Sequence, residues 1–135
     1  MLPDWPAGAV AILVTVGETP HAIPVSAALR AGPQRLLLGL ADGRGSLARL
    51  RADPRVAVVL LSAGVATTAR GRARVLETPA SDGVSAVEVT VDELDDHLRP
   101  TFALEDGVRW HWTDDQARQR DAAVRAGLAR LAESD

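Results

Sequence analysis

The sequence predicts a mostly β protein whose strands form an antiparallel barrel. Short apolar runs rich in β-branched residues alternate with turns that contain glycine or proline along most of the chain, which is typical of strands. Only two stretches have helical spacing, one short and internal and one near the C-terminus. Because consecutive strands without crossover helices pair mainly antiparallel, we expect a barrel or a sandwich rather than a doubly wound sheet.

Three strands are expected in the first third of the chain. Ala9–Val16 is an apolar, β-branched run and predicts a buried strand. His21–Arg30 has the composition of a second extended segment, in which Pro24 marks a strand start, a bulge or an edge position. After a turn at Ala31–Pro33, the apolar run Arg35–Leu40 predicts the third strand.

A short helix is expected after the third strand. Ser46 follows a glycine-rich turn and has the side chain of a helix N-cap. The predicted helix runs over Leu47–Ala52 and places Leu47 and Leu50 on its inner side. Asp53–Pro54 then ends it, because a residue before proline is disfavoured in helical conformation.

Two long strands are expected after this helix. Val56–Leu61 is too short and too β-branched for a helix and predicts the fourth strand. Val65–Glu77 alternates with a period of two, which predicts the fifth strand and places Arg70, Arg72 and Arg74 together on one of its faces.

The last part of the chain is expected to hold two strands and a helix. Alternating valines over residues 87–91 predict a sixth strand, and Val108–Trp112 predicts a seventh. Thr113 and Gln116 have the spacing of a capping box. A helix over residues 114–133 follows, with an apolar stripe formed by Val124, Leu128 and Leu131. We expect this helix to pack on the barrel or on a partner.

Composition limits the chemistry that the chain can perform. A length of 135 residues with 47% hydrophobic and 24% charged residues predicts one globular domain over residues 1–135, with the barrel at about 8–112. Cysteine is absent, which excludes thiol nucleophiles, disulfides and cysteine-ligated metals. All 15 basic residues are arginine, so Schiff-base chemistry on lysine is excluded as well.

Charge and hydropathy predict a soluble, cytoplasmic protein. The formal net charge of −3 gives no general attraction to nucleic acid, and the scarcity of aromatic residues leaves few surfaces on which bases could stack. No apolar run approaches the roughly 18 residues of a membrane span, and the N-terminus lacks the basic region of a signal peptide. We therefore expect neither nucleic acid nor membrane as a partner.

The turn before the internal helix is a candidate anion site. Residues 43–48 match the dinucleotide fingerprint G-x-G-x-x-A, but the strands that follow do not build a dinucleotide-binding fold. A glycine turn that leads into a helix N-terminus still presents free amides to an anion. Arg44, Ser46 and Arg49 are close enough in sequence to contribute. The alternative is an ordinary turn and cap.

Two further groups of residues are candidates for ligand binding. The row that begins at Arg70 could hold a phosphate or an acidic partner, although a solvated face paired with neighbouring carboxylates is favoured. Trp110 and Trp112 would share one face of a strand, where they could fill a core or interface or form a wall beside a flat aromatic ligand. His21, His97 and His111 form no recognised metal pair, and the serines form no hydrolase motif. The sequence singles out no metal ligand and no catalytic residue.

Taken in order, four segments resemble the flavin-binding split barrels of the pyridoxamine 5'-phosphate oxidase-like family. The segments are residues 20–26 (PHAIPVS), Leu36–Gly39, residues 50–57 (LRADPRVA) and residues 69–75 (ARGRARV). The resemblance spans roughly residues 8–77. It implies a six- to seven-stranded antiparallel Greek-key split barrel that forms a homodimer, with FMN or a deazaflavin bound in clefts between the subunits.

The resemblance also implies which residues hold the flavin. The ring would lie against Pro24, Val25, Ser26 and Ala27, and the phosphate would bind around residues 43–49. The chain departs from the family there, because the usual Ser/Thr-Arg-Lys grip aligns with Arg44, Gly45 and Ser46 and the lysine is missing. Arg44 and Arg49 are expected to replace it.

The expected activity is hydride transfer between the flavin and a small molecule, as in an oxidoreductase. The protein would supply binding and orientation, and the cofactor would supply the redox chemistry. Two alternatives share the same scaffold. One is a haem or other tetrapyrrole site with His21, His97 or His111 as ligand, and the other is a cofactor-free structural or interaction dimer.

Overall fold

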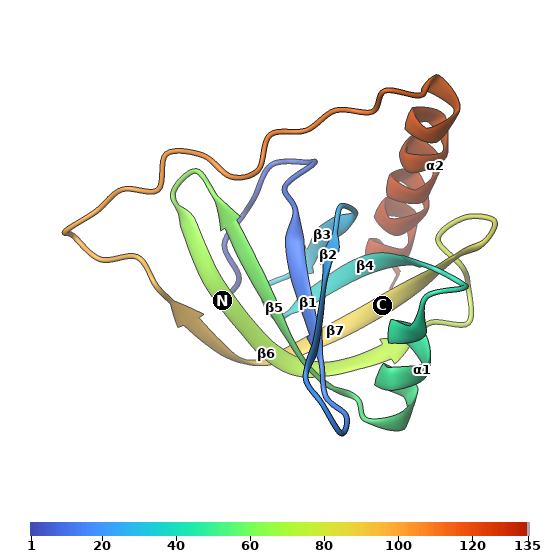
Figure 1. Ribbon diagram of the computed structural model, residues 1–135, viewed down its shortest axis with the longest axis horizontal. Coiled ribbons are helices and arrows are strands. Elements are labelled where there is room, and N and C mark those ends of the chain that lie inside the picture. Colours follow the sequence, from blue (N-terminus) through green and yellow to red (C-terminus); the bar gives the residue numbers. More distant parts are fainter. Residues whose placement is uncertain (135) are drawn as a thin grey trace.

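The computed structural model describes residues 1–134 as a curled sheet with two helices (Figure 1). No helix in these residues is long and apolar enough to cross a membrane. In chain order the elements are β1 (Ala11–Thr15), β2 (His21–Val25), β3 (Ala28–Gly32), β4 (Arg35–Ala41), α1 (Gly45–Ala52), β5 (Arg55–Ser62), β6 (Val65–Val75), β7 (Val84–Asp96) and α2 (Asp115–Ala132).

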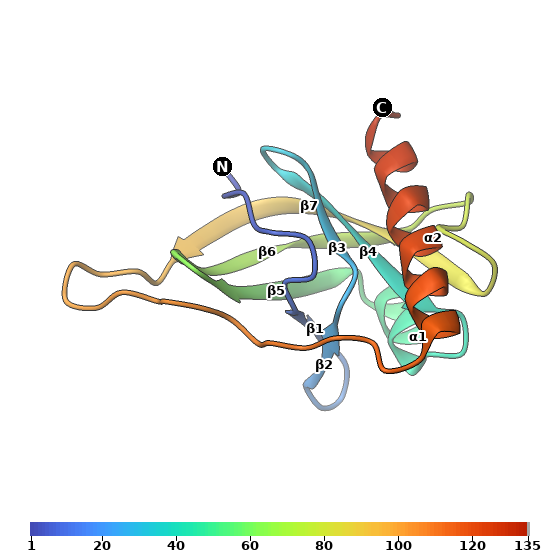
Figure 2. The same cartoon turned by 90° about the horizontal axis from the view of Figure 1, so that it is seen from above.

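The sheet is antiparallel throughout, which confirms the predicted fold class. Its strand order is β2-β1-β5-β6-β7-β4-β3, so the two edge strands are neighbours in sequence. The sheet curls into an open barrel around one core (Figures 1 and 2). Inward side chains of the central strands are fully buried, among them Leu13, Leu36, Leu38, Val58 and Val89.

The segment His21–Arg30 forms two strands rather than the single extended one that the sequence predicted. β2 pairs with β1 at one edge of the sheet, whereas β3 pairs with β4 at the other. Ser26 and Ala27 lie between them, outside both strands. The chain crosses from edge to edge at this point, which is where the barrel is split. The turn after β3 lies at Pro33–Gln34, because Gly32 still pairs with Arg35. As a result, the short helix follows the fourth strand instead of the third.

The prediction of a seventh strand at Val108–Trp112 is wrong. These residues belong to a long segment, residues 97–114, that has no regular secondary structure and connects the end of β7 to α2 across the open end of the sheet (Figure 1). The alternation in Trp110-His111-Trp112 therefore does not come from pairing in a β-sheet. Instead, the indole of Trp110 donates from Nε1 to the carbonyl oxygen of Gly8 at 2.8 Å.

Both predicted helix caps are also wrong. α1 begins at Gly45 with Arg44 as its N-cap, and no side chain caps it. Ser46 is therefore the second helical residue and is buried. The N-cap of α2 is Asp114, whose side chain accepts a hydrogen bond from the amide of Ala117 at 3.3 Å. Asp53, by contrast, does end α1 as expected.

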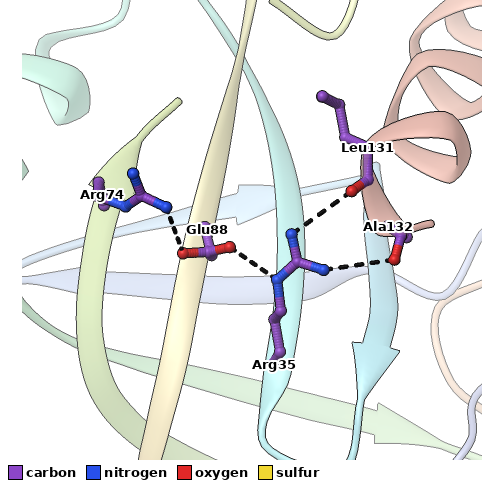
Figure 3. A network of polar contacts seen from close by, with 5 residues as sticks. All are labelled: Arg35, Arg74, Glu88, Leu131 and Ala132. Atoms are coloured by element: carbon purple, nitrogen blue, oxygen red, sulfur yellow. Dashed lines mark hydrogen bonds and ion pairs between the residues drawn. The ribbon is translucent and has the colours of Figure 1, made fainter. Parts of the chain in front are cut away.

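Helix α2 packs on the outer face of the sheet over β3 and β4, as the apolar stripe predicted (Figure 2). Val124 and Leu128 are buried there and Leu131 is partly buried, together with Leu37 and Ala86 of the sheet. Arg35 of β4 binds the C-terminal end of α2. Its guanidinium donates to the carbonyl oxygens of Leu131 and Ala132 and pairs with Glu88 at 2.7 Å (Figure 3). A cation at a helix C-terminus also interacts favourably with the helix dipole.

Candidate functional site

A cavity of about 740 Å³ lies between the N-terminal half of α2 and the sheet. Its sheet side is formed by Ser26 and Ala27 at the split of the barrel and by Gly39 and Ala41 of β4. Its helix side includes Arg120. We call it the α2 cavity. Its volume is within the range of small-molecule and cofactor sites.

The α2 cavity exists because the inward face of α2 changes character along its length. In the C-terminal half that face carries Val124 and Leu128, which fill the second core. One and two turns earlier, the same face carries Asp121 and Ala117, and the exposed side chains of Arg120 and Gln116 flank it at the rim of the cavity. A charged carboxylate does not pack into an apolar layer and an alanine is too small to fill one, so the helix covers a space there instead. Gln116 and Arg120 were not predicted as site residues; the signal for them in the sequence was their position one and two turns before Val124 on the same helix.

A second cavity, of about 620 Å³, adjoins the first and is called the indole cavity. It lies between residues 6–9, the end of β5, residues 106–112 and α2. The rings of Trp110 and Trp112 meet edge to face there, with centroids 5.1 Å apart and an interplanar angle of 83°. Trp112 and Asp121 line both cavities, so they separate the two.

Arg125 fixes α2 above the split of the barrel. Its Nε donates to the carboxylate of Asp121 at 2.7 Å, and its Nη2 donates to the carbonyl oxygen of Ser26 at 2.6 Å. Both the arginine and the aspartate are largely buried. A charge-assisted hydrogen bond of this kind is stronger than one between neutral groups. One ion pair therefore holds both the link between β2 and β3 and the part of α2 that separates the two cavities.

The predicted anion site at α1 is only partly available. Arg44 is exposed, and its amide bonds to the carbonyl oxygen of Ala41 at 2.9 Å, which places it one turn from the rim of the α2 cavity. Ser46 is buried instead of facing an anion. Arg49 is engaged with the β1–β2 hairpin, since it donates to Oγ1 of Thr15 at 3.1 Å and to the carbonyl oxygen of Thr19 at 2.6 Å.

The arginine row of β6 lies on the outer face of the sheet, as its alternation predicted. Arg70 pairs with Glu93 at 2.8 Å and with Asp95, and Arg74 pairs with Glu88 at 3.0 Å. The hydrogen bond from Arg70 holds the pKa of Asp95 below its usual value. For these two arginines the solvated, carboxylate-paired face is thus the correct interpretation.

The other predicted site residues lie in different places. Ser26, Ala27 and Trp112 meet in the α2 cavity, whereas Trp110 lies only in the indole cavity. Pro24 is exposed on β2, and Val25 is buried in the main core. The structure therefore brings together part of the expected ring site and leaves the α1 arginines and Arg70 outside it.

The three histidines do not form a common site. His111 lines the indole cavity. Nε2 of His97 lies 2.8 Å from Oγ1 of Thr68, and His21 is exposed on β2. Within residues 1–134, no group of three histidine, aspartate or glutamate side chains is placed to hold a metal ion.

Comparison with known proteins identifies the fold. No family model and no curated protein sequence matches the chain. A protein from Listeria innocua assigned as a pyridoxamine 5'-phosphate oxidase matches in structure, with 18% identity and a TM-score of 0.57, over 66% of this chain and 88% of that chain.

Two further solved structures match to a similar extent. One is a FAD-binding protein from Mesorhizobium loti, with 15% identity and a TM-score of 0.55, over 65% of this chain and 84% of that one. The other is an F420 reductase, with 13% identity and a TM-score of 0.56, over 65% and 90%. At such identities the likeness concerns the fold. The chain thus adopts the split-barrel fold of the pyridoxamine 5'-phosphate oxidase-like proteins.

Proposed function

We propose that this chain binds a flavin-type cofactor, FMN, in the α2 cavity and transfers a hydride between it and a small molecule. The observation that carries the proposal is the meeting of three features in one cavity: the split of the barrel at Ser26 and Ala27, an indole wall at Trp112 and a cationic side chain at Arg120. Solved structures of the same fold include a FAD-binding protein and an F420 reductase.

The residues of the α2 cavity fit a flavin ring. Ala41 and Ala117 have small side chains and leave room for a flat, rigid group, whereas the space above Gly39 is filled by Val124. Trp112 offers an aromatic surface against which such a ring can stack. The amides of Gln116 and Gln119 can donate hydrogen bonds to the ring carbonyls. A flavin bound there would supply the two-electron chemistry, while the chain binds and orients it and excludes water.

Arg120 and Arg44 would hold the phosphate. Arg120 lines the cavity directly, as do Asp82 and Asp121, of which Asp121 is paired with Arg125. Arg44 lies one turn beyond Ala41, just outside the lining. Arginine is suited to phosphate because its planar fork donates two parallel hydrogen bonds. Arg120 of α2 would then supply the positive charge of the lysine that is missing from the family pattern. The resemblance of the sequence to that family did not connect α2 to the site. Arg49 is not needed, since its donors are used on Thr15 and Thr19.

A homodimer is part of the proposal. The outer face of β1 and β5 carries the apolar side chains Ile12, Val14 and Val59, which are only partly buried in the single chain, and β2 continues this face at Pro24. A second copy would cover this surface. Sedimentation equilibrium at micromolar concentration should therefore give twice the chain mass of 14.2 kDa. A stable monomer would contradict this part of the proposal.

The phosphate assignment is tested by comparing FMN with riboflavin, which lacks the phosphate. Arg120→Ala and Arg44→Ala should each weaken FMN binding by about 10- to 150-fold, the equivalent of one charge-assisted contact of ~1.5–3 kcal/mol. Riboflavin should lose much less. Binding is measured by quenching of flavin fluorescence. Arg130→Ala serves as the control, because Arg130 is an exposed arginine in the last turn of the same helix and lines none of the cavities described above.

The results that would contradict the proposal are distinct. Equal losses for FMN and riboflavin would show that the arginines act through folding or ring contacts. Unchanged FMN binding in both variants would move the phosphate elsewhere, for example to Arg72 in the row of β6. Absence of flavin binding together with a Soret band on addition of haem would replace the flavin by a tetrapyrrole. Hydride transfer itself is tested by the loss of visible flavin absorbance when a reduced nicotinamide is added without oxygen.

A further inference from the structure

The indole cavity gathers most of the large apolar side chains that the fold leaves exposed. Leu61, Val108 and Trp112 are 48%, 67% and 38% exposed, and all three line this cavity. Of the other large hydrophobic residues exposed within residues 1–134, Met1 and Phe102 do not line it. Exposed apolar surface concentrated in a hollow marks a binding site more often than scattered exposure does.

One side of the aromatic wall of this cavity, Trp110, is fixed by a hydrogen bond. Nε1 of Trp110 is bonded to the carbonyl oxygen of Gly8, and the ring of Trp112 stands almost perpendicular to that of Trp110. Two indoles at a right angle form a corner. A flat ring can stack on one indole and meet the edge of the other, an arrangement that aromatic groups favour. Because Trp110 is already fixed by its hydrogen bond, a ligand would lose less free energy in ordering the corner.

The polar lining is richer in hydrogen-bond donors than in free acceptors. Its two carboxylates, Asp106 and Asp121, each accept from an arginine side chain. Three arginines, Arg109, Arg118 and Arg125, line the cavity. Both carboxylate oxygens of Asp106 already accept hydrogen bonds, one from the amide of Gly107 and one from Arg109, each at 2.8 Å.

Each guanidinium carries five N–H groups, so donors remain after these ion pairs are formed. Arg118, for example, uses Nε and Nη2 on a single oxygen of Asp115. A ligand of this cavity should therefore carry acceptor oxygens, and a cation should be disfavoured.

We propose that the indole cavity binds a planar aromatic acid, with its ring in the corner of Trp110 and Trp112 and its acidic group on Arg118. Arg118 is accessible to such a group because it is 61% exposed, whereas Arg125 is largely buried and engaged with Asp121 and Ser26. Arg109, which is 89% exposed, can donate to the same group. This site is separate from the proposed flavin site and shares only Trp112 and Asp121 with it.

The experiment uses two probes with the same ring, naphthalene acetate and its amide, which replaces the charged carboxylate by a neutral group of similar size. Calorimetric titration of the full chain should give one acetate per chain, with weaker binding of the amide. Arg118→Gln should weaken acetate binding on the order of 10-fold and reduce the difference between the two probes. Val108→Glu places a carboxylate on the rim at a side chain that is 67% exposed and should weaken the acetate more than the amide. Arg130→Gln, on the same helix but away from the cavity, should change neither.

Several results would overturn this inference. They are equal affinity for acetate and amide in the unaltered protein, a loss in Arg130→Gln as large as in Arg118→Gln, and displacement of the acetate by FMN in a one-to-one exchange. Melting temperatures of the variants are measured alongside, so that loss of folding is recognised. Titration with the acetate in the presence of saturating FMN tests whether the two sites are separate, because the acetate should still bind when the flavin site is full. Binding of the acetate without binding of FMN would contradict only the proposed flavin site.

Discussion

The close contact between α2 and the loop before β7 gives a prediction with an unusual sign. Gly127 is buried in the middle of α2, and a Cβ at this position would lie 1.7 Å from the carbonyl oxygen of Ala80. In an open helix, replacing glycine by alanine stabilises by about 0.5–1 kcal/mol. Here the backbone of residue 80 cannot yield as a flexible side chain would. Gly127→Ala should therefore destabilise the protein.

The size of the effect follows from how far the helix must retreat. Real Cβ atoms essentially never approach another heavy atom closer than 3.0 Å, so α2 must withdraw by about 1.3 Å. A gap of roughly 0.5–1 Å already forfeits a quarter to a half of the dispersion energy across a contact. Val124 and Leu128 are the buried side chains of α2 that would be loosened, each worth about 1.5–3 kcal/mol when fully buried. We expect a net loss of about 1–3 kcal/mol, as is typical of overpacking.

Chemical denaturation of Gly127→Ala, followed by circular dichroism, measures this loss. Gly45→Ala is the matched control, because Gly45 begins α1 and a Cβ there would meet nothing within 4 Å. The control should be as stable as the parent or slightly more stable. Trimming the side chain with Ala80→Gly should not rescue Gly127→Ala, since the clash is with a backbone oxygen. A Gly127→Ala protein at least as stable as the parent would refute the close packing of α2.

Three further changes test the same architecture. Leu128→Ala removes a side chain that is 1% exposed and should cost about 2–5 kcal/mol in a denaturation experiment, whereas an unchanged midpoint would mean that α2 is not docked. Arg49→Ala should cost about 1–3 kcal/mol, because the buried hydroxyl of Thr15 loses its donor, but it should leave flavin affinity unchanged; a selective loss of FMN over riboflavin would return Arg49 to the phosphate site. Burial raises the pKa of Glu88, but the hydrogen bonds from Arg35 and Arg74 outweigh it and hold this pKa below its ordinary value of 4.5. Glu88 therefore stabilises the fold above about pH 4.5, and this contribution is lost as pH falls further. Glu88→Gln should flatten the acid limb of a stability-versus-pH curve, and an unaltered limb would contradict the assignment.

Local patterns in the sequence were enough to predict the strands and the character of their faces. The alternation around Arg70, Arg72 and Arg74 is a property of neighbouring residues, and an extended chain has no other way to present it than on two opposite faces. The stripe of Val124, Leu128 and Leu131 likewise predicted a docked helix, and the strands without crossover helices predicted an antiparallel sheet. These inferences held because period and connection length act within a few residues.

The cavities were decided by contacts between residues far apart in sequence. The bond from Trp110 to Gly8 joins positions 102 residues apart, and the bond from Arg125 to Ser26 joins positions 99 apart. No local period contains such information. Trp110 and Trp112 have the sequence pattern of a strand, but the position of Trp110 is fixed by a bond to the N-terminal segment. Similarly, His21–Arg30 had the pattern of one segment, but its two halves pair with opposite edges of the sheet. Only the closing of the sheet and the docking of α2 across its split place Ser26, Trp112 and Arg120 around one space, because each contributes a wall that the others lack.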